Sequence, residues 1–139
     1  MNAVSAERTY VLAERFDKAL KTICVALADV ELEVAGDFDM AGLLDWRADG
    51  APSRSRVLLV DCPLLVFEAL ALDRASAVFF PLHILVSADG DRTQVSVVNS
   101  AELFDARLPV GAADPMDRLL ARVALALDTA MLRCGANRH

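Results

Sequence analysis

The 139-residue sequence lacks long hydrophobic runs. The apolar stretch Val57–Val60 ends at Asp61, and the stretch Leu64–Phe67 ends at Glu68. Neither approaches the roughly 20 apolar residues that cross a bilayer. The first eight residues also lack the basic and apolar regions of a secretory signal. We therefore expect a cytoplasmic protein with no membrane partner.

Cysteine and histidine are also scarce, with three cysteines and two histidines in the chain. Cys24, Cys62 and Cys134 are widely spaced and odd in number, which favours reduced thiols over a disulfide framework. Together with His83 and His139 they show no metal-ligand spacing, so no metal site is predicted. Nucleotide-binding glycine loops, the Gly-x-Ser-x-Gly motif and the His-Glu-x-x-His motif are absent. We assign no catalytic residue and identify no cofactor, which favours a protein that is not an enzyme.

Basic residues are fewer than acidic ones, 14 against 20, so the net charge is −6. An acidic chain with a pI near 4.8 argues against nucleic acid as a partner. Twelve arginines but only two lysines indicate a bacterial, GC-rich source. Apolar residues make up 55 % of the chain and charged residues 24 %, which excludes disorder. The length predicts one domain over residues 1–139.

Hydrophobic periodicity and turn residues predict the order of the elements. Gly36 and Asp37 are expected to end the second strand, and Pro81 indicates an edge position or a bulge in the fourth. In the last helix, Asp114 is expected as N-cap, with Pro115 at the first position and Gly135 at the end. The expected strands cover residues 8–13, 30–34, 56–60, 78–86 and 93–98, and the expected helices 14–28, 39–46, 63–72 and 115–134. This order predicts an α+β fold, a β-α-β(4)-α two-layer sandwich with a mostly antiparallel sheet and helices on one face.

Two helices carry more apolar surface than one core requires. Ala121, Leu125 and Leu132 lie almost opposite the expected core stripe of the last helix. The helix at 63–72 is apolar nearly all round, interrupted only by Glu68. Because such surface is unfavourable in water, we expect a homodimer.

Four short motifs carry a resemblance to a known family. They read Val57-Leu-Leu-Val-Asp-Cys-Pro63, Phe80-Pro-Leu-His-Ile-Leu-Val86, Ala88-Asp-Gly90 and Val95-Ser-Val-Val-Asn-Ser100. The chain here resembles the uncharacterised family catalogued as domain of unknown function 302. The resemblance implies a β-α-β(4)-α fold that forms dimers, and it implies no activity. The family's Gly-Asn-Pro is replaced by Asp61-Cys62-Pro63 and its closing Asp-Pro by Asn99-Ser100, so a ligand of those loops would meet different side chains here.

The ends of the expected central strands supply the candidate ligand-binding residues. Asp61 and Asn99 each end such a strand, and their side chains emerge at one edge of the sheet if the strands run in the same direction. Cys62 falls at an N-cap, which favours a thiolate, although Asp61 beside it opposes one. A passive, packed thiol is the alternative. His83 faces either a ligand or a dimer rim.

Three functional hypotheses follow from these observations. The leading one is a homodimer that binds a small molecule at the strand ends near Asp61, Cys62 and Pro63. The first alternative is a thiol-based redox or catalytic protein that uses Cys62. The second alternative is a protein-interaction subunit whose helices cover a different protein.

Overall fold

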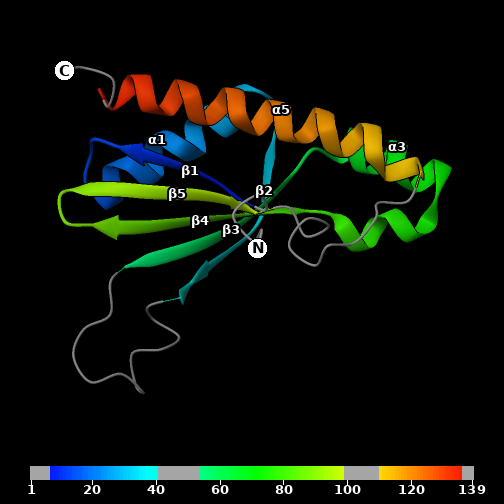
Figure 1. The fold of residues 1–139 in the computed structure, drawn as a ribbon, viewed down its shortest axis with the longest axis horizontal. Coiled ribbons are helices and arrows are strands. Elements are labelled where there is room, and N and C mark those ends of the chain that lie inside the picture. The colour runs from blue at the N-terminus through cyan, green and yellow to red at the C-terminus, as the bar shows by residue number, and fades with distance from the viewer. Residues whose placement is uncertain (1–6, 41–53, 99–109, 136–139) are drawn as a thin grey trace.

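A computed structural model describes residues 7–40, 54–98 and 110–135. The strands form one antiparallel five-stranded sheet in the order β1-β5-β4-β3-β2 (Figure 1). The elements are β1 (Glu7–Leu12), α1 (Phe16–Asp29), β2 (Glu33–Asp39), β3 (Ser55–Asp61), α3 (Pro63–Leu72), the 3₁₀ helix η2 (Arg74–Phe79), β4 (Leu82–Asp89), β5 (Arg92–Val98) and α5 (Val110–Arg133). The predicted α+β fold with a β-α-β(4)-α order is confirmed.

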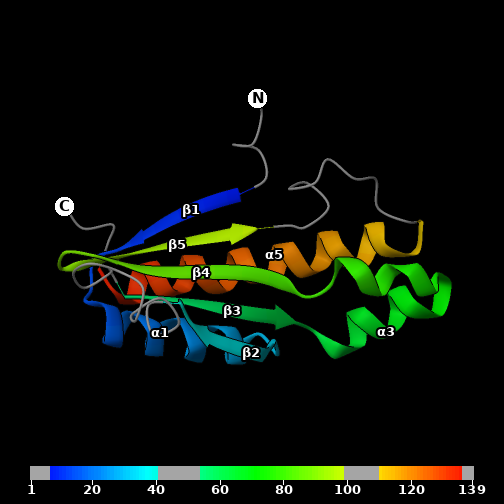
Figure 2. The same cartoon turned by 90° about the horizontal axis from the view of Figure 1, so that it is seen from below.

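One face of the sheet is covered by α1 and α5, while α3 extends beyond the sheet's end (Figure 2). In β4, buried Leu82, Ile84 and Val86 alternate with exposed His83 and Leu85, as expected of a strand covered on one face. The core lies between the sheet and the helices. Its largest fully buried side chains include Leu12, Ile23, Leu27, Leu58, Leu82, Ile84, Met116, Leu119 and Leu127. None of the described helices is both long and apolar enough to cross a membrane.

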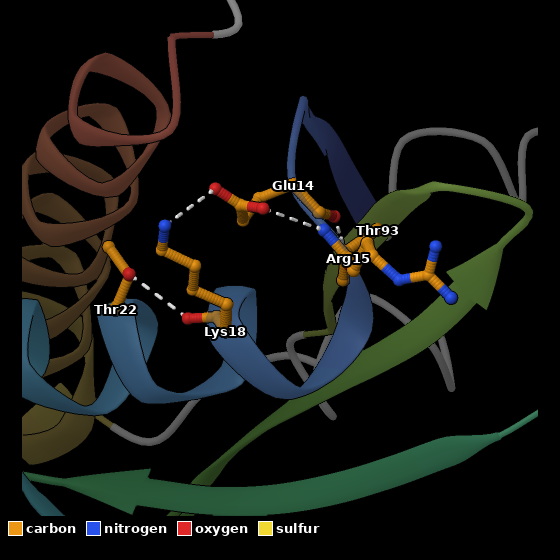
Figure 3. A network of polar contacts seen from close by, with 5 residues as sticks. All are labelled: Glu14, Arg15, Lys18, Thr22 and Thr93. Atoms are coloured by element: carbon orange, nitrogen blue, oxygen red, sulfur yellow. Dashed lines mark hydrogen bonds and ion pairs between the residues drawn. The ribbon is translucent and has the colours of Figure 1, made fainter.

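A polar network joins the start of α1 to the sheet (Figure 3). Thr93 Oγ1 donates a 2.8 Å hydrogen bond to the backbone oxygen of Glu14. The Glu14 carboxylate accepts from the N–H of Arg15 at 3.2 Å and lies 3.5 Å from Lys18 Nζ. This network fixes the first turn of α1 against β5.

The second strand begins and ends later than its sequence predicts. Helix α1 runs to Asp29, and Leu32 N–H returns to the carbonyl of Leu27 at 3.1 Å, so the chain turns before the strand begins. Gly36 and Asp37 lie inside β2 rather than ending it. A bulge between Val34 and Gly36 lets the strand continue past the glycine. Of the helix predicted at 39–46, residue 39 lies in β2 and residue 40 is helical, while residues 41–46 lie outside the described ranges.

The fourth strand also begins later than predicted. Asp73 caps η2, because its carboxylate accepts a 3.0 Å hydrogen bond from the N–H of Ala75. This 3₁₀ helix occupies the first part of the predicted strand. Pro81 therefore precedes β4, which is a central strand, and the predicted edge position or bulge is wrong. At the other end, Gly90 has φ 64° in the predicted hairpin turn.

The last helix begins earlier than predicted, at Val110. Asp114 is not its N-cap, since its carboxylate accepts a 3.0 Å hydrogen bond from Arg118 Nε one turn later. Pro115 lies inside the helix and is buried. The predicted end is confirmed, because Gly135 has φ 72°, a left-handed conformation that suits glycine.

Candidate functional site

The ends of β3 and β5 lie at the same end of the sheet. Both strands are antiparallel to β4, which lies between them, so both run toward α3 (Figure 2). The two strands therefore run in the same direction, which is the condition for Asp61 and Asn99 to emerge at one edge of the sheet. Asn99 itself lies outside the described residues, and Val98 is the last described residue of β5.

Asp61, the last residue of β3, lies directly opposite Glu33 of β2. Asp61 is half-buried and Glu33 is exposed. Burial raises the pKa of Asp61, and the negative charge of Glu33 raises it further. Two carboxylates side by side favour a bound proton, or a ligand that brings positive charge or hydrogen-bond donors.

Cys62 faces the helices rather than the site of Asp61. It is the N-cap residue of α3, and its backbone carbonyl accepts from the N–H groups of Leu65 at 2.9 Å and Val66 at 3.0 Å. Its side chain is 3 % exposed and packs in the core. Arg122 Nη1 on α5 donates to its Sγ over 3.5 Å. Asp61 and Cys62 are consecutive, but the side chain of Cys62 lies in the core and that of Asp61 lies on the open face of the sheet.

His83 shares the open face of the sheet with Asp61. It is exposed and pairs with Leu59 of β3 and Val98 of β5. Asp61 lies two residues beyond Leu59, a diagonal separation of roughly 7–8 Å between neighbouring strands. The structure therefore brings Asp61, Glu33 and His83 to one end of the open face, with Cys62 on the opposite side.

Further along the open face, toward the start of β3, lies an apolar row. Phe38, Val57 and Leu85 are neighbours in one row across three strands. Phe38 is 48 % exposed and Leu85 is 37 % exposed. This row lies four residues from Asp61 along β3, toward the other end of that strand, so it does not border the carboxylates of Asp61 and Glu33.

Helix α3 has the most exposed large apolar side chains of the described residues. Leu64, Phe67 and Leu72 are 76 %, 71 % and 76 % exposed. The only charge on the helix, Glu68, forms an ion pair with Arg118 of α5. The sequence indicates the apolar character of this helix, but not which of its residues stay exposed.

The predicted interface residues of α5 lie away from the core. Leu125 is 57 % exposed, Leu132 is 62 % exposed, and Ala121 is also exposed. Residues on the other side of the helix, such as Leu127, are fully buried. The predicted division of α5 into a core stripe and an outer apolar stripe is confirmed.

A groove that the sequence does not predict lies at the opposite end of the sheet, and we call it the strand–helix groove. It has a volume of about 510 Å³ and lies beside β1 and the end of α5. Its position depends on β1 being an edge strand, and no sequence motif marks that. Its lining residues are Thr9, Tyr10, Val11, Ala13, Arg92, Asp128, Met131 and Gly135.

Comparison with known proteins identifies the family. The model of the family described as "Domain of unknown function DUF302" matches residues 8–130, most of the chain. The chain belongs to the DUF302 family. A solved structure of an uncharacterised conserved DUF302 protein from Bacillus stearothermophilus is similar, with a TM-score of 0.63 and 14 % sequence identity. The alignment covers 93 % of this chain and 94 % of that one. No curated protein matches the sequence.

Membership in DUF302 accounts for the fold and agrees with the motifs found in the sequence. At 14 % identity, the Bacillus stearothermophilus protein supports the shared fold alone. The role of Asp61, Cys62 and His83 must therefore be argued from their surroundings in this chain.

Proposed function

We propose that this DUF302 domain is a non-catalytic binding protein that acts as a homodimer, with the apolar face of α3 in the dimer interface. A small molecule binds at the adjoining end of the sheet, near Asp61. The observation that carries the proposal is the exposure of Leu64, Phe67 and Leu72, each above 70 %. Leu64 and Phe67 lie three positions apart and share one side of α3 with Ala71.

The size of the hydrophobic effect supports an interface larger than α3 alone. Burying a leucine or phenylalanine contributes about 1.5–3 kcal/mol, so covering these three partly exposed side chains contributes about 4 kcal/mol in each subunit. Association costs an estimated 4–15 kcal/mol in lost motion. The α3 faces of two subunits, at about 8 kcal/mol, are comparable with that cost. We therefore include Ala121, Leu125 and Leu132 of α5 in the interface.

Three features support a ligand site near Asp61. The carboxylates of Asp61 and Glu33 are adjacent, and His83 lies on the same face. Asp61 is also two residues before α3, so a ligand there borders the proposed interface. The expected ligand is a small molecule that brings a positive charge or several hydrogen-bond donors.

The dimer is tested with two variants and a matched control. Phe67→Glu places a charge in the centre of the α3 face, and Leu125→Asp places one on α5. Val25→Glu changes a residue of α1 that is 54 % exposed and outside the proposed interface. Light scattering after size-exclusion chromatography should give twice the 15.0 kDa chain mass for the wild type and Val25→Glu. The two interface variants should be monomers with unchanged circular dichroism.

A wild-type monomer at every concentration would overturn the homodimer. It would leave the interaction subunit as the better explanation of the apolar face. A dimer that persists in Phe67→Glu but dissociates in Leu125→Asp would move the interface to α5. Native mass spectrometry of the purified protein tests the ligand: extra mass that is lost in Asp61→Asn supports the site, and a bare protein counts against it.

The contact between Arg122 and Cys62 favours a second candidate function. Arg122 Nη1 lies 3.5 Å from the Sγ of Cys62, which is at the N-cap of α3. A neighbouring arginine and a helix N-terminus are common surroundings of reactive cysteines. The 3 % exposure of Cys62 opposes this function, because a reagent or substrate must reach the sulfur. The rate of alkylation of Cys62 separates the two candidates.

A further inference from the structure

The strand–helix groove follows the outer edge of β1. Thr9 and Val11 point to the opposite face of the sheet from Tyr10, yet all three line the groove. A groove meets both sets of side chains only if it runs along the side of the strand. Among the described strands, β1 has a single neighbour, β5. The backbone N–H and C=O groups on its other side therefore face the groove.

We propose that this groove binds an extended polypeptide segment of another protein, which adds a sixth strand to the sheet beside β1. Backbone hydrogen bonds to β1 hold the segment on one side. Asp128 and Met131 of α5 provide the opposite wall. This proposal does not depend on the ligand near Asp61, since the groove lies at the other end of the sheet. The groove borders the α5 part of the proposed dimer interface, because Leu132 lies one turn from Asp128.

The charges of the groove define the chemistry of the segment. Arg92 and Asp128 both line it, and neither has an ion-pair partner within residues 7–40, 54–98 and 110–135. An extended segment with one basic and one acidic side chain complements both walls. Met131 and Val11 add apolar surface, which favours β-branched residues between the two charges.

The other edge of the sheet is built differently. Strand β2 has a bulge between Val34 and Gly36, and it carries the acidic residues Glu33, Asp37 and Asp39. Bulges and charged residues are the usual means by which an edge strand resists pairing. In contrast, β1 pairs with β5 without a bulge, and its charged residues, Glu7 and Arg8, are confined to its start. Residues 9–12, beside the groove, are Thr-Tyr-Val-Leu, with no charge, proline or glycine. The favourable edge for strand addition is therefore β1.

The test uses the synthetic peptide acetyl-Lys-Thr-Val-Thr-Glu-amide and the whole 139-residue protein. Titration into ¹⁵N-labelled protein should shift the amide resonances of residues 9–13 and slow their hydrogen exchange. Two matched peptides, N-methylated at the odd or at the even residues, keep their side chains, and each loses the backbone donors along one edge of the strand. One of the two should bind at least about tenfold more weakly, since the hydrogen bonds to β1 use the donors of a single edge.

The charge requirement is tested in the protein. Arg92→Glu should weaken binding of the peptide about two- to fivefold, the effect of an exposed ion pair. Arg74→Glu makes the same change on η2, outside the groove, and should leave the affinity unchanged.

Three results would overturn the proposal. Equal affinity for both N-methylated peptides would show recognition of side chains without strand addition. Concentration-dependent protection of the β1 amides without peptide would show that a second copy of this chain occupies the edge. No shift at millimolar concentrations of either this peptide or one with its charges exchanged would show that the groove does not take an extended strand.

Discussion

Glu33 lies directly across the β2–β3 ladder from Asp61, so two carboxylates meet where the sheet adjoins α3. On the same two strands, Asp37 is instead bound by Arg56 through two hydrogen bonds of 2.8 Å. The pKa of Asp61 is raised, chiefly by burial, and the pKa of Asp37 is lowered, chiefly by its bonds to Arg56. These two carboxylates therefore affect stability with opposite dependences on pH.

Asp61→Asn should stabilise the protein at neutral pH. Because the folded pKa of Asp61 exceeds its ordinary value of 3.8, the unfolded chain releases this proton first. Stability therefore falls as pH rises from about 4 through the folded pKa. Removing the like-charge contact should raise the free energy of unfolding by about 0.5 kcal/mol at neutral pH, with no change below about pH 3. Urea unfolding across this range measures the difference, and an equal effect at both ends would exclude ionisation as its cause.

Asp37→Asn should have the opposite effect. The bond to Arg56 lowers the pKa of Asp37 in the folded protein below its ordinary value of 3.8. The ion pair therefore stabilises the folded protein at neutral pH, and this stabilisation is lost as the pH falls through the lowered pKa. We expect a loss of about 0.5–1 kcal/mol in the free energy of unfolding at neutral pH, as for a partly exposed ion pair. The loss should shrink in acid and in high salt. A loss that is independent of both would mean that packing, not charge, is responsible.

Much of the fold could be predicted from local sequence patterns. The apolar spacing of α1 and the Pro63 start of α3 led to correct elements, because each depends on neighbours within one or two turns. Some errors occurred where tertiary contacts decide. The bulge at Gly36 depends on pairing with β3. The start of α5 at Val110 is a different error, since Asp114 and Pro115 are a local N-terminal signal that the helix does not use.

One buried and one exposed residue of α1 test how much packing contributes to stability. Ile23 is fully buried, and Val25, on the same helix, is 54 % exposed. Ile23→Ala should lower the free energy of unfolding by about 3 kcal/mol, from lost burial and the cavity left behind. Val25→Ala should change it by less than about 0.5 kcal/mol. Thermal unfolding followed by circular dichroism tests both, and similar losses would mean that Val25 packs against something in solution.

The candidate site was only partly accessible to sequence analysis. Side chains alternate between the two faces of a strand, so the sequence is sufficient to place His83 on the open face. The neighbour of Asp61 depends on register between β2 and β3, which the chain between them does not specify. The contact of Cys62 with Arg122 joins residues 60 positions apart. Such long-range pairs leave no periodic signal, so the separation of Asp61 from Cys62 emerges only in the structure.

The reactivity of Cys62 decides between a packed thiol and a functional one. In the folded protein its sulfur is shielded, so alkylation by iodoacetamide at about pH 8 should be at least about tenfold slower than in urea. Mass spectrometry of the peptides reports each cysteine separately. Half-buried Cys24 should react sooner than Cys62, although burial raises the pKa of its thiol. Arg122→Met keeps most of the side-chain packing and removes the guanidinium. If Cys62 instead reacts rapidly at neutral pH and slows in Arg122→Met, the guanidinium activates the thiol, and a thiol-based function replaces the non-catalytic one.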